Sequence, residues 1–422
     1  MPSENAAVVI LHCLHPGARS AAQRVNGFAT YLREFGYNVK VIESNNTVRE
    51  FGYHFVDDIE VVSFDEKGIV SPLQIASNEN WIIRKIKVLF NRLIYMACFD
   101  VHSHWTKRAE EHLRKLAENR QVKFVISTFA PVGPHRAALK VRKIFPELVW
   151  IADMRDEMSA APHLTWFERW RMRRLEREVV NTADGVVSVS KPLIEQFKVF
   201  SSGDVIFREI RNGYNYTSAL PVSEKGARKL DAGNEFCIRY LGSFYGSITP
   251  VAFLSALSGI AERLPGVRVE FIGPQKKFSV PDNIREAVEF REAVTYRDAT
   301  TLMQHSDLLL LFLPSGRRKG VFSGKIFEYL ASGVPILGLV PQDDVAADLI
   351  RKARAGDVVD GEDIAGIQEC ILRAYARWQS GELPDVDRLV VEAHHRREQV
   401  RRLAALMQEI SAGIQASDRE RK

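Results

Sequence analysis

Residues 322–337 read FSGKIFEYLASGVPIL, and this stretch predicts a short helix that begins near Lys325, ends at Gly333 and leads into a buried strand. Small residues at a helix start let a phosphate approach free backbone N–H groups, and the helix dipole adds partial positive charge. Lys325 supplies a full charge. Glu328 shares its helix face and can accept hydrogen bonds from two ribose hydroxyls. The stretch therefore predicts a site for a nucleotide diphosphate sugar.

The stretch is not a P-loop. Lys319 stands where the first glycine of that motif is required, and Ile326 stands where Ser or Thr would hold magnesium. An exposed ion pair between Lys325 and Glu328 on an ordinary helix remains the alternative to the nucleotide site.

Short apolar runs alternate with helical patterns on both sides of this stretch, which predicts parallel, doubly wound sheets. In the first half we expect strands at residues 7–11, 38–42, 124–127, 149–152 and 185–189, and helices at 21–34, 134–144 and 191–200. In the second half we expect strands at residues 237–241, 267–272, 308–312 and 335–339, and helices near 251–263, 325–331 and 346–353.

A chain of 422 residues exceeds what one hydrophobic core usually serves. A break rich in Gly, Ser and Lys separates the two halves. We therefore expect an N-terminal domain at residues 1–216, a linker at 217–234, a C-terminal domain at 235–390, a terminal helix at 391–416 that packs back on the N-terminal domain, and a frayed tail at 417–422.

The segment SGKIFEYLASGVPIL closely resembles the donor site of the retaining glycosyltransferases of family 4, especially bacterial members that build surface polysaccharides. Other segments resemble that family in the expected order: residues 15–42, 127–143, 150–158, 188–197, 211–215, 240–246 and 307–314. The resemblance implies the GT-B fold, in which two Rossmann-like doubly wound domains face each other across a cleft. It also implies that the N-terminal domain binds the acceptor and that the C-terminal domain binds the nucleotide-sugar donor. One departure is Gly320, where the broader family has a glutamate eight positions before Glu328.

Ligands of open α/β sheets bind beyond the carboxyl ends of the strands, so residues that follow each apolar run are the donor-site candidates. Together with the resemblance, this criterion adds to Lys325 and Glu328 the small residues Gly17, Gly242, Ser243, Gly273, Ser323 and Gly324.

The same criterion gives candidates in the N-terminal domain. His135 and Asp156 are the expected catalytic residues, because a retaining transfer needs groups that accept the acceptor proton and hold the sugar. Arg24, Asp153 and Arg155 are expected either to contact the acceptor or to support the site structurally, with an internal ion pair between Arg155 and one aspartate as the structural alternative.

We expect neither a metal nor a cofactor. No Asp-x-Asp motif stands at a suitable strand end, since Asp57-Asp58 and Asp343-Asp344 have the wrong spacing. The charge of the leaving diphosphate is then expected to be stabilised by Lys325 and backbone amides.

The four scattered cysteines form neither a disulfide framework nor a metal motif, which favours the cytoplasm. The chain shows no signal-peptide pattern and no apolar run of the roughly 18 residues that span a bilayer. Residues 81–96 and 163–177, however, combine apolar or aromatic side chains with Lys and Arg, and these segments predict peripheral contact with the inner face of a membrane. Ordinary packed helices with basic faces are the alternative. Nucleic-acid binding is not expected, because no recognised module is present.

The sequence thus predicts a hexosyltransferase-type enzyme that moves a sugar, with retention, from a nucleotide diphosphate sugar to a glycan or polyprenyl-linked glycan in surface-polysaccharide synthesis. The alternatives are a sugar-nucleotide epimerase on the same fold and a noncatalytic protein that binds nucleotide sugars.

Overall fold

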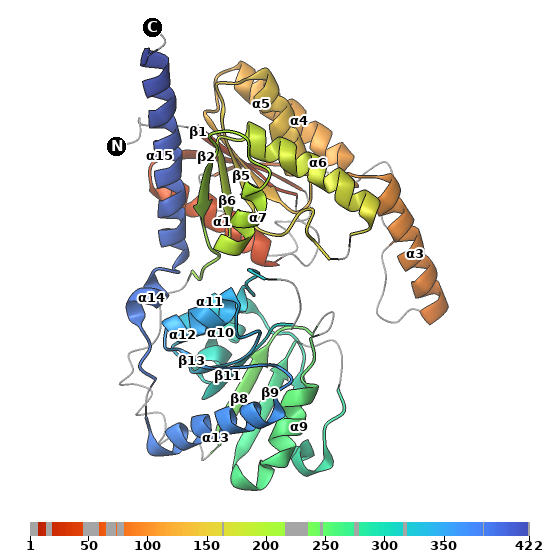
Figure 1. Ribbon diagram of the computed structural model, residues 1–422, viewed down its shortest axis with the longest axis vertical. Helices are drawn as coiled ribbons and strands as arrows, with labels where there is room; N and C mark the ends of the chain where they lie inside the picture. Colours follow the sequence, from red (N-terminus) through yellow and green to blue (C-terminus); the bar gives the residue numbers. More distant parts are fainter. Residues whose placement is uncertain are drawn as a thin grey trace. The chain divides into compact units, whose positions relative to one another are not determined.

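The computed structural model divides the chain into two compact units, unit 1 (Met1–Arg211 with Arg396–Lys422) and unit 2 (Asn212–His395) (Figure 1). It describes residues 7–13, 19–44, 59–64, 73, 80–162, 164–215, 235–244, 248–273, 278–314, 319–382 and 384–420. The linker expected at residues 217–234 lies outside the described residues.

Within the described residues, unit 1 is built on a seven-stranded parallel sheet in the order β3-β2-β1-β4-β5-β6-β7. The strands are β1 (Ala7–Leu11), β2 (Asn38–Ser44), β3 (Glu60–Phe64), β4 (Phe124–Phe129), β5 (Val149–Met154), β6 (Gly185–Ser188) and β7 (Ile206–Glu209). The strand order reverses between β1 and β4, and this switch point is where doubly wound sheets bind ligands.

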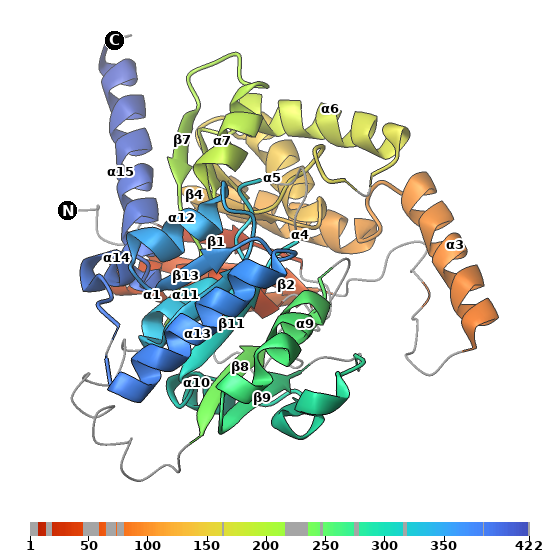
Figure 2. The same ribbon diagram turned by 60° about the horizontal axis from the view of Figure 1, so that its bottom comes forward.

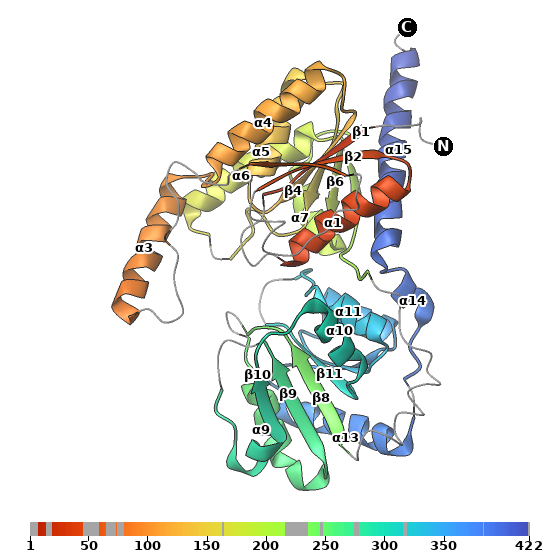
Figure 3. The same ribbon diagram turned by 180° about the vertical axis from the view of Figure 1, so that it is seen from behind.

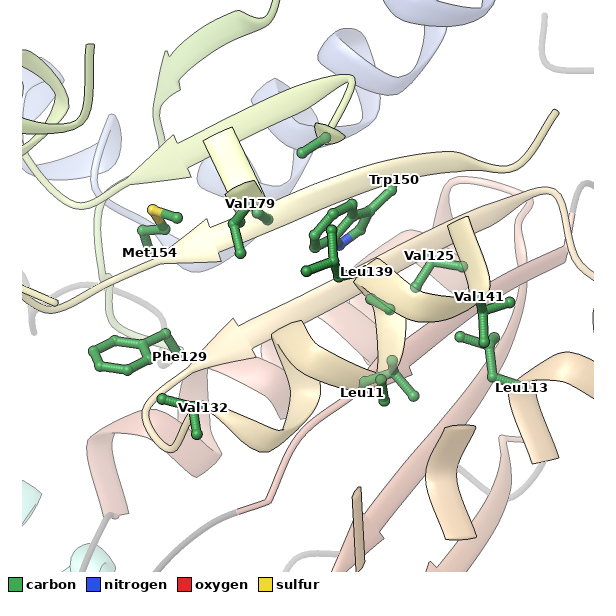
Figure 4. Close-up of a cluster of buried hydrophobic side chains, with 14 of the residues drawn as sticks. Leu11, Leu113, Val125, Phe129, Val132, Leu139, Val141, Trp150, Met154 and Val179 are labelled. Atoms are coloured by element: carbon green, nitrogen blue, oxygen red, sulfur yellow. The ribbon is translucent and has the colours of Figure 1, made fainter. Parts of the chain in front are cut away.

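Helices cover both faces of this sheet. One face packs on α4 (Ser103–Glu118), α5 (Gly133–Ile144), α6 (Trp166–Thr182) and α7 (Lys191–Lys198), and the other packs on α1 (Arg19–Glu34) and α15 (Arg396–Glu420). Alternate residues of β1 serve the two cores, with Val9 and Leu11 in the first and Val8 and Ile10 in the second. Figure 4 shows Trp150 in the first core, among side chains of the strands and helices.

The described part of unit 2 repeats this architecture with a six-stranded parallel sheet in the order β10-β9-β8-β11-β12-β13 (Figure 3). The strands are β8 (Phe236–Leu241), β9 (Val267–Ile272), β10 (Val288–Arg291), β11 (Leu308–Phe312), β12 (Ile336–Leu339) and β13 (Gly356–Val359). The strand order reverses between β8 and β11, which gives unit 2 its own switch point.

The two faces of the unit 2 sheet are also covered. One face packs on α9 (Val251–Gly259) and α13 (Ile364–Ser380), which lie side by side in Figure 2. The other face packs on α10 (Tyr296–Gln304), α11 (Lys325–Ser332), α12 (Val345–Lys352) and α14 (Arg388–Glu392). Both sheets confirm the expected class of two doubly wound α/β units.

The C-terminal region differs from the single helix expected at residues 391–416. The helix is interrupted between α14 and α15, where Tyr214 and His395 form an isolated β-bridge. The backbone carbonyl of His394 accepts a hydrogen bond from the Tyr214 amide, so the turn between α14 and α15 is tied to another segment of unit 2. After this interruption α15 packs on α1 in unit 1 and remains helical through Glu420, so helix replaces the frayed tail expected from residue 417.

Candidate nucleotide-diphosphate site

The switch point of unit 2 brings together the segments that follow β8 and β9 and the start of α11. α11 begins at Lys325 and ends at Gly333, whose φ of 66° gives the left-handed cap that glycine favours. This confirms the helix expected from the sequence. Gly242 and Gly273 follow β8 and β9 directly, and their backbones lie against each other.

Lys325 lies across the end of β8. Its Nζ donates a hydrogen bond to the Tyr240 hydroxyl at 2.9 Å and lies 4.5 Å from the centre of the Tyr240 ring. A Cβ added to Gly242 would meet both Cε and Nζ of Lys325 at 2.2 Å. Gly242 also has a φ of 144°, which other residues rarely adopt. The glycine is therefore needed for the ammonium group to reach this position.

The environment of Lys325 disfavours its charge. Burial lowers its pKa to about 8, and among the described residues no carboxylate lies within ion-pair distance of its Nζ. Its hydrogen-bond partner is a neutral hydroxyl, which compensates a buried charge only in part. An anion bound beside Nζ would stabilise the charged form of Lys325, so the site favours a phosphate group.

Glu328 lies one helical turn beyond Lys325 and accepts a hydrogen bond from the Tyr296 hydroxyl at 3.0 Å. Tyr296 is the first residue of α10, and its side chain is exposed. The carboxylate is therefore held at the surface beside an aromatic ring. This arrangement suits a ribose, whose hydroxyls can donate to the remaining lone pairs of the carboxylate.

The backbone around these side chains supplies further polar groups. The Ser243 hydroxyl donates to the Gly273 carbonyl at 3.0 Å, which ties the loop after β8 to the loop after β9. Gly324 is the N-cap of α11, and no side chain caps the helix there. Ser323 and Gly324 thus leave the first turn of α11 without a side chain over its N–H groups, the arrangement that anions use at helix starts.

Gly320, which stands where the broader family has a glutamate, adopts a backbone conformation that favours glycine. Its φ is 85°, a conformation that a glutamate would adopt only with strain, and its N–H donates to Asp344 Oδ1 at 2.8 Å. Asp344 also caps the start of α12 through Val345. Glycine at this position therefore anchors the segment to α12.

Arg24 and Asp153 form a buried ion pair in unit 1. The guanidinium donates to both carboxylate oxygens, with Nη2 to Oδ1 at 2.8 Å and Nε to Oδ2 at 3.0 Å, and Nη2 also donates to the Ile210 carbonyl. Both side chains are almost fully buried. The pair joins α1, β5 and the end of β7 and is not exposed, which favours structural support over contact with an acceptor.

His135 lies in the first turn of α5 and is completely buried beside Phe129 and Trp150. Its Nδ1 is 2.7 Å from the Ser127 hydroxyl, which also accepts the Trp150 indole N–H at 2.8 Å. Burial lowers the pKa of His135 to about 4 against the raising effect of Asp153, so the ring is neutral at pH 7. The Ser127 hydroxyl satisfies Nδ1 in either neutral tautomer of the ring, because a hydroxyl can both donate and accept. The other ring nitrogen, Nε2, is buried and has no hydrogen-bond partner among the described residues.

Arg155 and Asp156 pair with each other at 2.9 Å beyond the carboxyl end of β5. Asp156 is the more exposed member, with 37% of its side chain accessible. Asp156 is thus the accessible carboxylate of this segment, whereas the side chain of Asp153 is fully buried. Gly17 lies outside the described residues.

The amino ends of the unit 2 strands enclose a different hollow of about 1240 Å³. Its arginines already have acidic partners, including Arg239 with Glu270 at 2.5 Å and Arg377 with Asp357 at 3.7 Å. These paired charges leave no cation there to attract a phosphate. The candidate site is therefore assigned to the opposite edge, where Lys325 lies.

The structure brings together Gly242, Ser243, Gly273, Lys325 and, one turn away, Glu328. Sequence reasoning missed Tyr240, which holds the Lys325 ammonium. Its position two residues before Gly242 on a buried strand was the available signal. In the described residues no three His, Cys, Asp or Glu side chains are grouped to hold a metal ion.

No protein-family model matches the chain, and no curated protein matches it in sequence. Solved structures match over nearly its whole length. A glycosyltransferase from Rickettsia africae has a TM-score of 0.65 at 11% identity, covering 97% of this chain and 99% of that one. Anabaena HepE in complex with UDP and glucose has a TM-score of 0.60 at 13% identity, covering 96% and 100%. A UDP-GlcNAc 2-epimerase from Methanocaldococcus jannaschii has a TM-score of 0.54 at 9% identity, covering 96% and 99%.

These likenesses define the fold. The two parallel sheets with their interleaved helices are the two Rossmann-like domains of the GT-B fold, which confirms the fold class expected from the sequence.

The lowered pKa of Lys325 predicts pH-dependent binding of a nucleotide diphosphate. An anion beside Nζ raises the pKa above about 8, so binding takes up a proton when the free ammonium is deprotonated. The affinity for UDP, measured by calorimetry, should fall by up to about tenfold per pH unit above pH 8. Lys325→Arg keeps its charge and should remove this dependence. An equal slope in both proteins would place the titrating group elsewhere.

The buried His135 predicts acid sensitivity. Its pKa is about 4 in the folded protein against about 6.5 for an unperturbed histidine, so the unfolded chain binds more protons between these values. Its contribution to stability is therefore complete above pH 6.5 and lost as the pH falls toward 4. In urea unfolding, His135→Gln should reduce this pH-dependent loss by about 3 kcal/mol. His305→Gln, which replaces an exposed histidine, is the control and should behave as wild type.

Proposed function

We propose that the chain is a glycosyltransferase that moves a sugar from a nucleotide diphosphate sugar to a hydroxyl of a glycan or a polyprenyl-linked glycan. The observation that carries the proposal is the position of Lys325, a partly buried ammonium held over Gly242 at the switch point of unit 2 without a carboxylate partner among the described residues. The GT-B fold and the UDP bound to Anabaena HepE support the choice of donor.

The proposed mechanism assigns the donor to unit 2. Lys325 and the first backbone amides of α11 would stabilise the charge that develops on the leaving diphosphate, and Glu328 would hold the ribose. Gly242, Ser243 and Gly273 would provide the surface against which the donor lies. We propose further that the reaction retains anomeric configuration, in keeping with the resemblance to family 4, and serves surface-polysaccharide synthesis as a hexosyl transfer.

His135 and Asp156 are proposed to act in unit 1. Asp156 is exposed and adjacent to a charged partner, which suits it to contact the acceptor. The neutral His135 would form a hydrogen bond to a sugar hydroxyl through Nε2, and its lowered pKa would make it a weak base at neutral pH. Access to this buried nitrogen would require Phe129 or its neighbours to shift.

A sugar-nucleotide epimerase is the second candidate, because the fold also matches the 2-epimerase from Methanocaldococcus jannaschii. Both functions need a nucleotide diphosphate site. They differ in the product, since an epimerase changes the sugar while it leaves the nucleotide attached.

The function is tested by incubating the protein with UDP-glucose and with UDP-GlcNAc, each with and without a polyprenyl-diphosphate sugar acceptor, and separating the products. We expect acceptor-dependent release of UDP that persists in excess chelator, because Lys325 would carry the charge that a metal handles elsewhere. Conversion of the sugar without release of UDP would establish the epimerase. A complete, magnesium-reversible loss in chelator would show that an ion shares the site.

The roles of the two units predict different defects. Lys325→Ala and Glu328→Ala should each weaken binding of the nucleotide by roughly 1.5–3 kcal/mol, or about one to two decades in affinity, because each loses a charge-assisted contact. His135→Ala and Asp156→Ala should lower turnover more than affinity.

Lys352→Ala and Glu262→Ala remove exposed charges of unit 2 and serve as matched controls for binding. Unchanged nucleotide affinity in both site variants would remove the basis of the site. Full turnover in the His135 or Asp156 variant would leave that residue with a structural role alone.

A further inference from the structure

Helix α3 (Trp81–Ala97) exposes an apolar face along most of its length. At 100° per residue, one continuous side of the helix carries Ile82, Ile83, Ile86, Leu89, Phe90 and Leu93, and each of these side chains is 44–62% exposed. A helix that packed on a core would bury this side. In Figures 1 and 3, α3 extends away from the sheet of unit 1, and the labelled helices near it pack on other surfaces of that unit.

The charges of α3 border this apolar face. The helix contains Arg84, Lys85, Lys87 and Arg92 but no acidic residue. Lys87 lies at one edge of the apolar face and Lys85 at the other, with the Lys85 ammonium 4.7 Å from the Trp81 ring centre. The described part of the helix thus combines a continuous apolar side with flanking charges of one sign.

The start of α6 continues the same surface. Trp166 and Trp170, one turn apart, are 81% and 55% exposed, and Phe167 stacks on Trp170. The Arg171 guanidinium lies over both Phe167 and Phe99, at 5.5 and 4.7 Å from the ring centres. Because Phe99 lies two residues after the end of α3, this stack joins the end of α3 to the first turns of α6.

We propose that α3 and the start of α6, here called the basic-aromatic surface, dock unit 1 on an anionic lipid bilayer. Helix α3 would lie in the plane of the interface, with its apolar side inserted and its Lys and Arg residues among the headgroups. The tryptophans of α6 would lie at the same level, where amphipathic aromatic rings are favoured. None of the described helices combines the length and apolar character that a bilayer crossing requires, so the contact is peripheral.

A lipid surface fits these residues better than a second copy of the chain. In a two-fold interface each α3 would meet another α3 or its neighbourhood, and the four basic residues would face like charges with no acid on either helix to offset them. Anionic headgroups instead offer complementary charge at the edge of an apolar phase. This inference stands on exposed residues of unit 1 and does not depend on the proposed function.

The experiment is vesicle flotation with phosphatidylcholine alone and with phosphatidylcholine mixed with phosphatidylglycerol. Wild type should float with the mixed vesicles, and added salt should reduce binding. Ile86→Ser/Leu89→Ser removes part of the apolar side, and Arg84→Glu/Lys85→Glu reverses two charges. Each double variant should lower the partition coefficient by roughly tenfold or more.

The matched control is Ile144→Ser/Val199→Ser, which removes two apolar side chains of unit 1 that are 57% and 77% exposed but lie on other helices. It should float as wild type does. Tryptophan quenching by lipids with brominated acyl chains gives a second measurement, and Trp166→Phe and Trp170→Phe should each reduce it.

Three results would overturn the proposal: no flotation of wild type with anionic vesicles at low salt, equal flotation of the control and both α3 variants, or quenching that both Trp→Phe variants leave unchanged. A concentration-dependent dimer that Ile86→Ser/Leu89→Ser dissociates, without loss of flotation, would assign the apolar side of α3 to a second copy instead.

Discussion

The Lys325 ammonium over Gly242 is the contact on which the candidate site depends. Three local features position this ammonium: a glycine with a φ of 144° after β8, a tyrosine two residues earlier whose hydroxyl accepts a hydrogen bond from it, and a helix that begins at the lysine. Any side chain at residue 242 would occupy the position of Nζ. Burial at this position disfavours the charged form of Lys325, as its lowered pKa shows, and an anionic ligand would favour the charged form again.

The two units differ in the partners that they give to a cation removed from solvent. In unit 1, Arg24 is matched by Asp153 and by two backbone carbonyls, so its charge is internally satisfied. In unit 2, Lys325 has a hydroxyl and an aromatic ring. A satisfied pair fixes the elements it joins and has little affinity left for a ligand, whereas a partly satisfied ammonium retains affinity for an anion. This contrast is the physical reason for placing the phosphates of the donor in unit 2.

Much of the architecture could be predicted from sequence because central parallel strands are buried on both faces and therefore form continuous apolar runs. β1, β8, β9 and β11 were recognised for that reason. The edge strands β3, β10 and β13 were missed, since they are partly exposed and carry polar residues that weaken the apolar signal. The interruption between α14 and α15 was missed because it is caused by a bridge to Tyr214, far away in the sequence.

The candidate site shows the same limit. Lys325, Glu328 and the glycines stand in one short motif or directly after strands, and their spacing predicted a shared site. The pairing of Arg24 with Asp153 and the burial of His135 beneath Trp150 depend on contacts between distant segments, which spacing does not encode. Burial then changes the chemistry, because it keeps the His135 ring neutral and makes it a weak base. The exposed apolar side of α3 is the converse case: its periodicity fits both a membrane contact and a packed helix, and the structure leaves that side uncovered by the described residues. A helix with such a side and only basic charges is most stable where an apolar phase meets an anionic surface, which is also where a polyprenyl-linked acceptor would be found.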